Sequence, residues 1–277
     1  MLRFPLALAG SLLILSAAQA QLAIQNIQPG YGPLGPERPD LAYHHLDHVS
    51  FRFTVSGARP DEEGIANVHI ATQLTAVRSA AQPPPAGWVD GKVVGNSDRG
   101  CAALLQFGSS FAEAVCFTLP KLLEPGEYLL TVSVKDDHLK ANPVSFERKL
   151  ILLPEEFAIT SPEFYYDGEG QVEAPFGGMV GQKLHFQFNI IGIACSTGKK
   201  DIETRFEVLD AKTRQPLSKP IVKADQTAMP QLAQSCMRLS SMIPLDRPGD
   251  FILRVTATDR LANKTANLEV PIRVSAP

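Results

Sequence analysis

Apolar residues occupy every second position in the stretch 125–136, where a Pro-Gly pair, an acid and Tyr128 lead into the alternating run. A period of two is typical of a β-strand with one buried face. The Pro-Gly pair before the run and the Asp after it both favour turns. The same order of residues returns at 248–259, and each stretch is followed by a second alternating run, at 146–152 and at 268–274. The pattern therefore predicts an antiparallel hairpin at the end of each half of the chain.

The similarity between the two halves extends upstream of the hairpins. Residues 24–57 match residues 159–192 without a gap, and Gly57 falls on Gly192. Between this segment and the hairpin, the first copy is about twelve residues longer than the second. A repeat of this length indicates two copies of one domain, because the units of a solenoid are only about 20–50 residues long.

Further apolar runs predict the remaining strands of each copy. They lie at 22–28, 49–55, 66–75 and 113–119 in the first half and at 183–193, 202–209, 216–223 and 235–243 in the second. We therefore predict an all-β chain of two antiparallel β-sandwiches, residues 21–154 and 155–277. Pro154-Glu155-Glu156 at the boundary is too short for a flexible linker, so we expect the sandwiches to keep a fairly fixed relation.

The Pro-Gly turn, the aromatic residue after it and the closing hairpin resemble the immunoglobulin-like or fibronectin-type sandwiches of secreted bacterial proteins. In such domains a tyrosine stands at the corner where strand F begins. The resemblance covers both halves of the chain, although the strand B cysteine and strand C tryptophan of antibody domains are missing. It implies a tandem immunoglobulin-like fold that acts as a spacer, an adhesin or a binding accessory, and it implies no enzyme chemistry.

The first 20 residues have the organisation of a signal peptide. Arg3 forms a positive start, residues 6–18 are an apolar core, and Ala18-Gln19-Ala20 is a small-x-small cleavage site. We expect cleavage before Gln21 and a secreted or periplasmic protein. No later run approaches the roughly 18–20 apolar residues that cross a bilayer. The formal net charge of −3 argues against a nucleic-acid partner.

Four cysteines in an exported chain predict disulfides. Three connectivities are open. We favour Cys101–Cys116 and Cys195–Cys236, because each bridge then stays inside one copy of the repeat. A four-cysteine zinc site is the alternative, but it lacks any C-x-x-C spacing.

A cluster of histidines at 43–48 is the most unusual segment of the chain. His44, His45 and His48 stand close to Asp47, and imidazole and carboxylate groups are ligands for transition metals. The alternative is a polar turn that leads into the strand at 49–55. The matched segment of the second copy has no such ligands, so a metal site would belong to one copy only.

Aromatic side chains in loops are the candidates for carbohydrate binding. Trp88, Tyr31, Tyr165 and Tyr166 offer planar faces on which a sugar can stack. The alternative is structural: Trp88 seals the edge of a core, and Tyr165 and Tyr166 pack against the domain junction.

The sequence lacks the G-x-S-x-G, H-E-x-x-H, Walker and EF-hand patterns. Together these observations predict an exported, non-catalytic structural or protein-interaction module of the cell envelope, with no cofactor. Its partner would be a protein or an envelope glycan. Carbohydrate binding and metal binding through the histidines are the alternatives.

Overall fold

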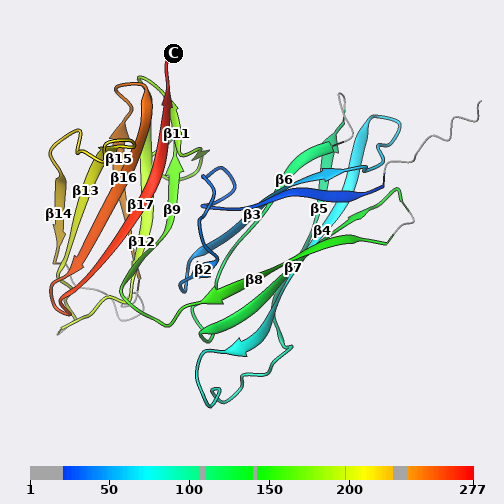
Figure 1. The fold of residues 1–277 in the computed structure, drawn as a ribbon, viewed down its shortest axis with the longest axis horizontal. Coiled ribbons are helices and arrows are strands. Elements are labelled where there is room, and N and C mark those ends of the chain that lie inside the picture. Colours follow the sequence, from blue (N-terminus) through cyan, green and yellow to red (C-terminus); the bar gives the residue numbers. More distant parts are fainter. Residues whose placement is uncertain (1–20, 106–109, 140–141, 197, 227–235) are drawn as a thin grey trace, which may run out of the picture.

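The computed structural model describes residues 21–105, 110–139, 142–196, 198–226 and 236–277, and these form strands joined by turns and loops (Figure 1). The predicted signal peptide, residues 1–20, lies outside the described residues. Within the described residues, no helix is long and apolar enough to cross a membrane.

The first half of the chain forms two sheets. The smaller has the strand order β1 (Ala23–Gly30), β3 (His48–Ser56), β6 (Ser110–Thr118). The larger has the order β2 (Ala42–Tyr43), β8 (Val144–Leu152), β7 (Gly126–Asp136), β4 (Ile65–Ser79), β5 (Val93–Leu104). One hydrophobic core lies between them.

The second half repeats this arrangement. Its smaller sheet has the order β10 (Glu173–Ala174), β9 (Ala158–Tyr165), β12 (Lys183–Ile191), β15 (Cys236–Pro244). Its larger sheet has the order β11 (Gly177–Met179), β17 (Lys264–Ser275), β16 (Gly249–Asp259), β13 (Ile202–Asp210), β14 (Ile221–Asp225). A second core lies between these sheets.

The two halves share one topology. In the smaller sheets, the order β1-β3-β6 of the first half corresponds to β9-β12-β15 of the second. In the larger sheets, the order β2-β8-β7-β4-β5 corresponds to β11-β17-β16-β13-β14. In both larger sheets the short first strand pairs in parallel with the last strand, whereas the other strand pairs are antiparallel. Figure 1 shows the halves side by side, with β2 between them. The predicted all-β fold of two immunoglobulin-like sandwiches is confirmed.

The alternating runs place their apolar residues as predicted. Leu130, Val132 and Val134 on β7 are fully buried, and they alternate with half-buried positions. The predicted corner tyrosine is also found, because the Tyr128 hydroxyl donates a hydrogen bond to the carbonyl of Glu124, four residues upstream.

Several strands differ from the sequence prediction, which gives no strand at β2, β5, β9, β10 or β11. Strand β5 was not expected, because this edge strand is mostly exposed and lacks an alternating apolar pattern. The strand expected at 216–223 begins only at Ile221, because the preceding loop contains Pro216 and Pro220, which cannot donate to a ladder.

Matched glycines hold the same bend in both halves. Gly57 and Gly192 have φ values of 74° and 65° and follow β3 and β12. A Cβ atom on either would lie 2.3 Å from a backbone carbonyl oxygen, of Gln21 or of Glu156. Each position therefore excludes every residue with a side chain.

Matched aspartates tie the end of strand β7 and of strand β16 to a neighbouring loop. Asp136 is 2% exposed and accepts hydrogen bonds from the backbone N–H groups of Arg59 and His138, at 2.6 and 2.7 Å. Asp259 is fully buried and accepts from Ala194 and Leu261 in the same way. The bonds from His138 and Leu261 form the predicted turns. The bonds from Arg59 and Ala194 connect each aspartate to a second loop, which follows β3 or β12.

The substitution Asp136→Ala is expected to destabilise the first sandwich by about 3 kcal/mol, because two backbone N–H groups lose the buried carboxylate that accepts their hydrogen bonds. Trp88 is the only tryptophan and lies in this half, so its fluorescence during urea unfolding measures the change. Asp137→Ala, at an exposed neighbour, is the control and should change stability by less than about 0.5 kcal/mol. Equal effects of the two substitutions would contradict the role of the buried carboxylate.

Candidate functional site

Asp47 connects the two halves of the molecule. It lies in the turn before β3 and is 2% exposed. Its carboxylate accepts hydrogen bonds from Arg38 Nη1 at 2.8 Å, from the His48 backbone N–H at 3.0 Å and from the Ser161 backbone N–H at 3.1 Å. Since Ser161 belongs to β9, a buried charge of the first sandwich is satisfied in part by the backbone of the second.

An irregular residue in β9 makes this bond possible. The pairing of β9 with β12 shifts register between Thr160 and Glu163, and Ser161 in the gap has a φ of 50°. Such a bulge frees a backbone N–H from the sheet. The Ser161 hydroxyl donates to the carbonyl of Leu46 at 2.9 Å, and Leu46 also has a positive φ, of 62°. Two unusual backbone conformations therefore meet at one contact between the halves.

Arg38 is fixed by several contacts around Asp47. Its Nη2 donates to the carbonyl of Ala42 at 2.7 Å, and its guanidinium lies over the rings of Tyr43 and Tyr31, at 4.1 and 5.3 Å. Burial alone would lower the pKa of Arg38, but the adjacent Asp47 carboxylate outweighs it and raises that pKa. The Arg38 guanidinium therefore keeps its charge inside the junction.

A second ion pair lies beside the first. His48 Nδ1 is 2.7 Å from Glu163 Oε1, and Glu163 Oε2 also accepts from the hydroxyl of Tyr165 and from Arg238 Nη2, at 2.7 and 2.8 Å. The hydrogen bond to Glu163 raises the pKa of His48 despite partial burial. Burial opposes the charge of Glu163, but the bonds from His48 and Tyr165 outweigh it and lower the pKa of Glu163.

We call this set of side chains the junction cluster; its members are Arg38, Asp47, His48, Ser161, Glu163 and Arg238. The sequence pattern identifies the segment 43–48 as unusual, but it indicates the histidines there as candidate metal ligands. Arg38, Glu163 and Arg238 were not predicted, because each stands alone in the sequence and is brought to the cluster only by the fold.

The three candidate metal ligands have separate environments. His48 pairs with Glu163, while His44 Nε2 lies 3.9 Å from Glu156, at the start of the second half. His45 is buried, and its Nδ1 has no hydrogen-bond partner. Among the described residues, no group of three or more His, Cys, Asp or Glu side chains is arranged to hold a metal ion. His44 and His48 therefore each contact a carboxylate of the second half.

Of the four candidate sugar-binding aromatics, only Tyr166 is exposed, at 45%. Tyr165 is buried and bonded to Glu163. Tyr31 stacks on Phe176 of the second half at 6.4 Å. Trp88 packs edge-on against Tyr128 at 5.6 Å and thus closes the edge of the first core. These four rings are spread over both halves and form no common platform.

The two predicted disulfides are not present; the structure contains Cys101, Cys116, Cys195 and Cys236 without a bridge. Cys101 packs against the first core, and its thiol donates a hydrogen bond to the Glu113 carboxylate at 2.8 Å. Cys116 follows the buried Val115 on β6 and is exposed on the other face of that sheet. The predicted bridge would have to join a residue of β5 that packs against the core to a residue of β6, in the other sheet, that lies on the face away from the core. In the second half, Cys195 is exposed, whereas burial raises the pKa of Cys236.

No protein-family model matches this chain, and no curated protein matches it either. Among solved structures, the C-terminal domain of the Streptococcus pyogenes antigen I/II-family protein AspA is 8% identical, with 91% of this chain and 99% of that chain covered and a TM-score of 0.31. The C-terminal domain of the Streptococcus agalactiae AgI/II polypeptide BspA is 10% identical, with 91% and 100% covered and a TM-score of 0.31.

Red sea bream transglutaminase is 10% identical, with a TM-score of 0.26; the alignment covers 93% of this chain but only 31% of that enzyme. At such identities and TM-scores these likenesses add nothing to an argument about function. The fold assignment rests on the strand topology itself.

The stability of the protein should depend on the ionisation of His48. Because its folded-state pKa is raised, the His48–Glu163 pair contributes fully below the unfolded pKa of about 6.5 and less as the pH rises through the folded value. We expect the free energy of unfolding, from urea titrations followed by circular dichroism, to fall over that interval. His48→Gln should remove this dependence, whereas His69→Gln, at a half-exposed histidine of β4, should retain it. Identical pH profiles for the two variants would contradict the assignment.

Proposed function

We propose that this chain is an exported, non-catalytic structural or protein-interaction module of the cell envelope, in which two immunoglobulin-like sandwiches are held in one fixed relation. The observation that carries the proposal is the bond from Ser161 of the second half to the buried Asp47 carboxylate of the first. A charge buried in this way is tolerated only when every partner is in place. If the two halves keep one fixed relation, the Ser161 N–H stays within hydrogen-bond distance of Asp47.

Burial around the junction supports a rigid connection. On β9, Ala158, Thr160 and Ser161 are all at most 7% exposed, and on β12 Ile191 is 2% exposed. Strand β8 ends at Leu152 and β9 begins at Ala158, so the connection is short. A short linker combined with a buried contact disfavours independent motion of the domains. Such a module sets a distance and an angle between whatever binds at its two ends.

The state of the ionisable groups supports a non-catalytic role. Cys116 and His48 line the same small cavity, of about 90 Å³, beside Glu163. A nucleophilic cysteine needs a lowered pKa. Burial and the nearby Glu173 and Glu163 carboxylates instead raise the pKa of Cys116 to about 11. The thiol is therefore protonated near neutral pH, and His48 is engaged with Glu163.

Location in the envelope follows from the predicted signal peptide at residues 1–20. The proposal is tested with the mature chain, from Gln21 onward, in two experiments. Small-angle X-ray scattering should fit a single relation of the two halves. A broad panel of hydrolase substrates should show no turnover. Free reorientation of the halves, or turnover that one substitution abolishes, would refute the proposal.

Asp47→Asn is expected to loosen the junction, because Arg38 loses its buried counter-charge and an amide replaces the acceptor. The loss should be about 3 kcal/mol, and unfolding should separate into two transitions. The measurements are urea unfolding and the scattering profile. Asp40→Asn is the matched control, since Asp40 also contacts Arg38 but its side chain is 63% exposed. The control should change stability by less than about 1 kcal/mol. A single unchanged transition in Asp47→Asn would count against the fixed junction.

A further inference from the structure

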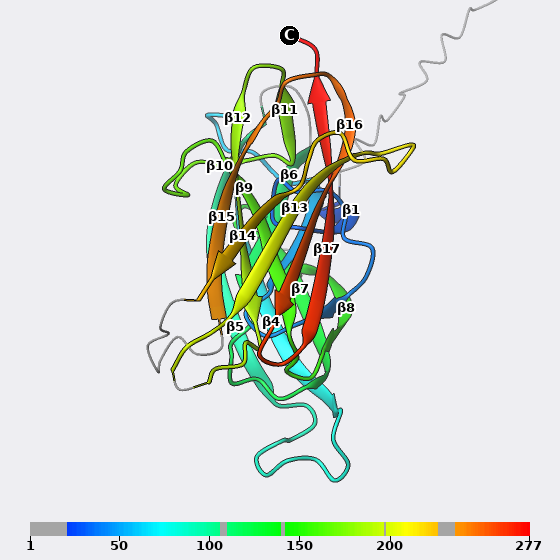
Figure 2. The same ribbon diagram turned by 90° about the vertical axis from the view of Figure 1, so that its left-hand side faces the viewer.

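The second sandwich has an open seam between β14 and β15, the edge strands of its two sheets (Figure 2). Strand β14 pairs with β13 and β15 pairs with β12, and each strand has no neighbour on its other side among the described residues. Lys223 on β14 reaches across the seam and donates to the carbonyl of Ser240 on β15 at 3.1 Å. Beside this bridge a cavity of about 230 Å³ opens into the core.

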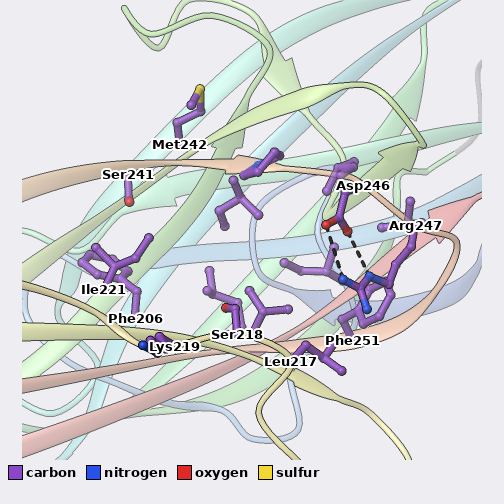
Figure 3. Close-up of a pocket in the computed structure, with 17 residues that line it drawn as sticks. Phe206, Leu217, Ser218, Lys219, Ile221, Ser241, Met242, Asp246, Arg247 and Phe251 are labelled. Carbon is purple, nitrogen blue, oxygen red and sulfur yellow. Dashed lines mark hydrogen bonds and ion pairs between the residues drawn. The ribbon is translucent and has the colours of Figure 1, made fainter.

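The cavity has an apolar interior and a charged rim (Figure 3). Phe206, Phe251 and Leu253 come from the core, and all three are at most 8% exposed. Leu217 lies on one side of the cavity and Ser241 of β15 on the other, whereas the Met242 side chain points outward at the rim, as the close-up shows. We call this cavity the seam slot.

The first sandwich has an aromatic side chain at the matched place. Tyr128 and Phe251 occupy the same position in the two Pro-Gly repeats, and the residues just before each turn line the respective cavities. In the first half, Trp88 lies against Tyr128 with ring centroids 5.6 Å apart and an interplanar angle of 66°. Trp88 belongs to the long connection between β4 and β5, residues 80–92. The fold therefore accepts a bicyclic aromatic ring at this corner.

The second half lacks that ring. Its connection between β13 and β14 spans only residues 211–220 and brings Leu217 to the corner. An apolar cavity of about 150 Å³ is enough to bind benzene. The seam slot, at about 230 Å³, is large enough for a bicyclic ring such as indole.

The charges at the rim favour an anion. The slot is lined by two cationic side chains, Lys219 and Arg247, and by one carboxylate, Asp246. The Lys223 ammonium lies beside it, 5.4 Å from the centre of the Phe206 ring. Arg247 pairs with Asp246 at 3.1 Å, and Lys223 is bonded to Ser240. Lys219 has no ion-pair partner among the described residues, so its charge is available to a ligand.

We propose that the seam slot binds a small aromatic anion, with a bicyclic ring on Phe251 in the place that Trp88 fills in the first half and a carboxylate at Lys219. This site is separate from the junction cluster, so it is independent of the proposed structural function. The ring contributes most of the affinity by burial, and Lys219 selects the sign of the charge.

The test is isothermal titration of the mature chain with indole-3-acetate and, separately, with tryptamine, which carries a similar ring and the opposite charge. Indole-3-acetate should bind at one site per chain and at least three-fold more tightly than tryptamine. Backbone amide chemical shifts should change around Leu217, Met242 and Phe251 and not around Trp88. Equal affinity for the two compounds, shift changes centred on Trp88, or no binding at millimolar concentrations would overturn the proposal.

Two variants separate the ring from the charge. Lys219→Glu, at an exposed position, should weaken indole-3-acetate about three- to five-fold and leave neutral indole unchanged. Lys212→Glu is the control on the same loop and should bind like the parent chain. Leu217→Trp should fill the slot from within and abolish binding of both compounds, with the fold checked by circular dichroism. Unchanged binding of indole-3-acetate by Lys219→Glu, or by a folded Leu217→Trp, would reject the site.

Discussion

The burial of one carboxylate, Asp47, is the constraint on which the two-domain structure depends. Removing a carboxylate from water costs several kcal/mol unless charge and hydrogen bonds replace the water. Arg38 supplies the charge, and backbone N–H groups of His48 and Ser161 supply the bonds. One of these donors comes from the other half, so the first sandwich alone leaves the carboxylate under-satisfied. The junction is therefore specific as well as stable, because few other arrangements present an N–H group at that point.

The donor at the junction derives from a feature of the repeat. Asn26 in β1 falls on Ser161 in β9, and both have a positive φ at a register shift in their strands, with values of 52° and 50°. In the first half Asn26 at this bulge is exposed, and its side-chain amide donates a hydrogen bond to the Thr54 hydroxyl. In the second half the same bulge faces its neighbour and provides the N–H that Asp47 accepts. A backbone irregularity common to both copies has thus become an interdomain contact in one of them.

The sequence predicted the parts of the structure that depend on local pattern. The period of two in β7 and β16, the Pro-Gly turns and the turn-forming Asp136 and Asp259 require only neighbouring residues, and each was predicted. The junction depends instead on residues far apart in the chain, such as Asp47 and Ser161, whose meeting is decided by the packing of whole domains. The histidine segment raised the hypothesis of a metal site, and alternation cannot reveal that His48 faces Glu163. The disulfide prediction was wrong because spacing along the chain does not show that Cys116 points away from the core.

The contrast between the two corners shows where the copies have diverged. Their strands and buried glycines are equivalent, since any change there disturbs a core or a backbone contact. The connection between β4 and β5 lies on the surface and tolerates a change of length. In the first copy this connection is long enough to place Trp88 against Tyr128. In the second copy the equivalent connection, between β13 and β14, is shorter, and Phe251 lies beside a cavity. Covering an apolar edge removes more of its surface from water, so a ligand in the proposed seam slot would do for the second copy what Trp88 does for the first.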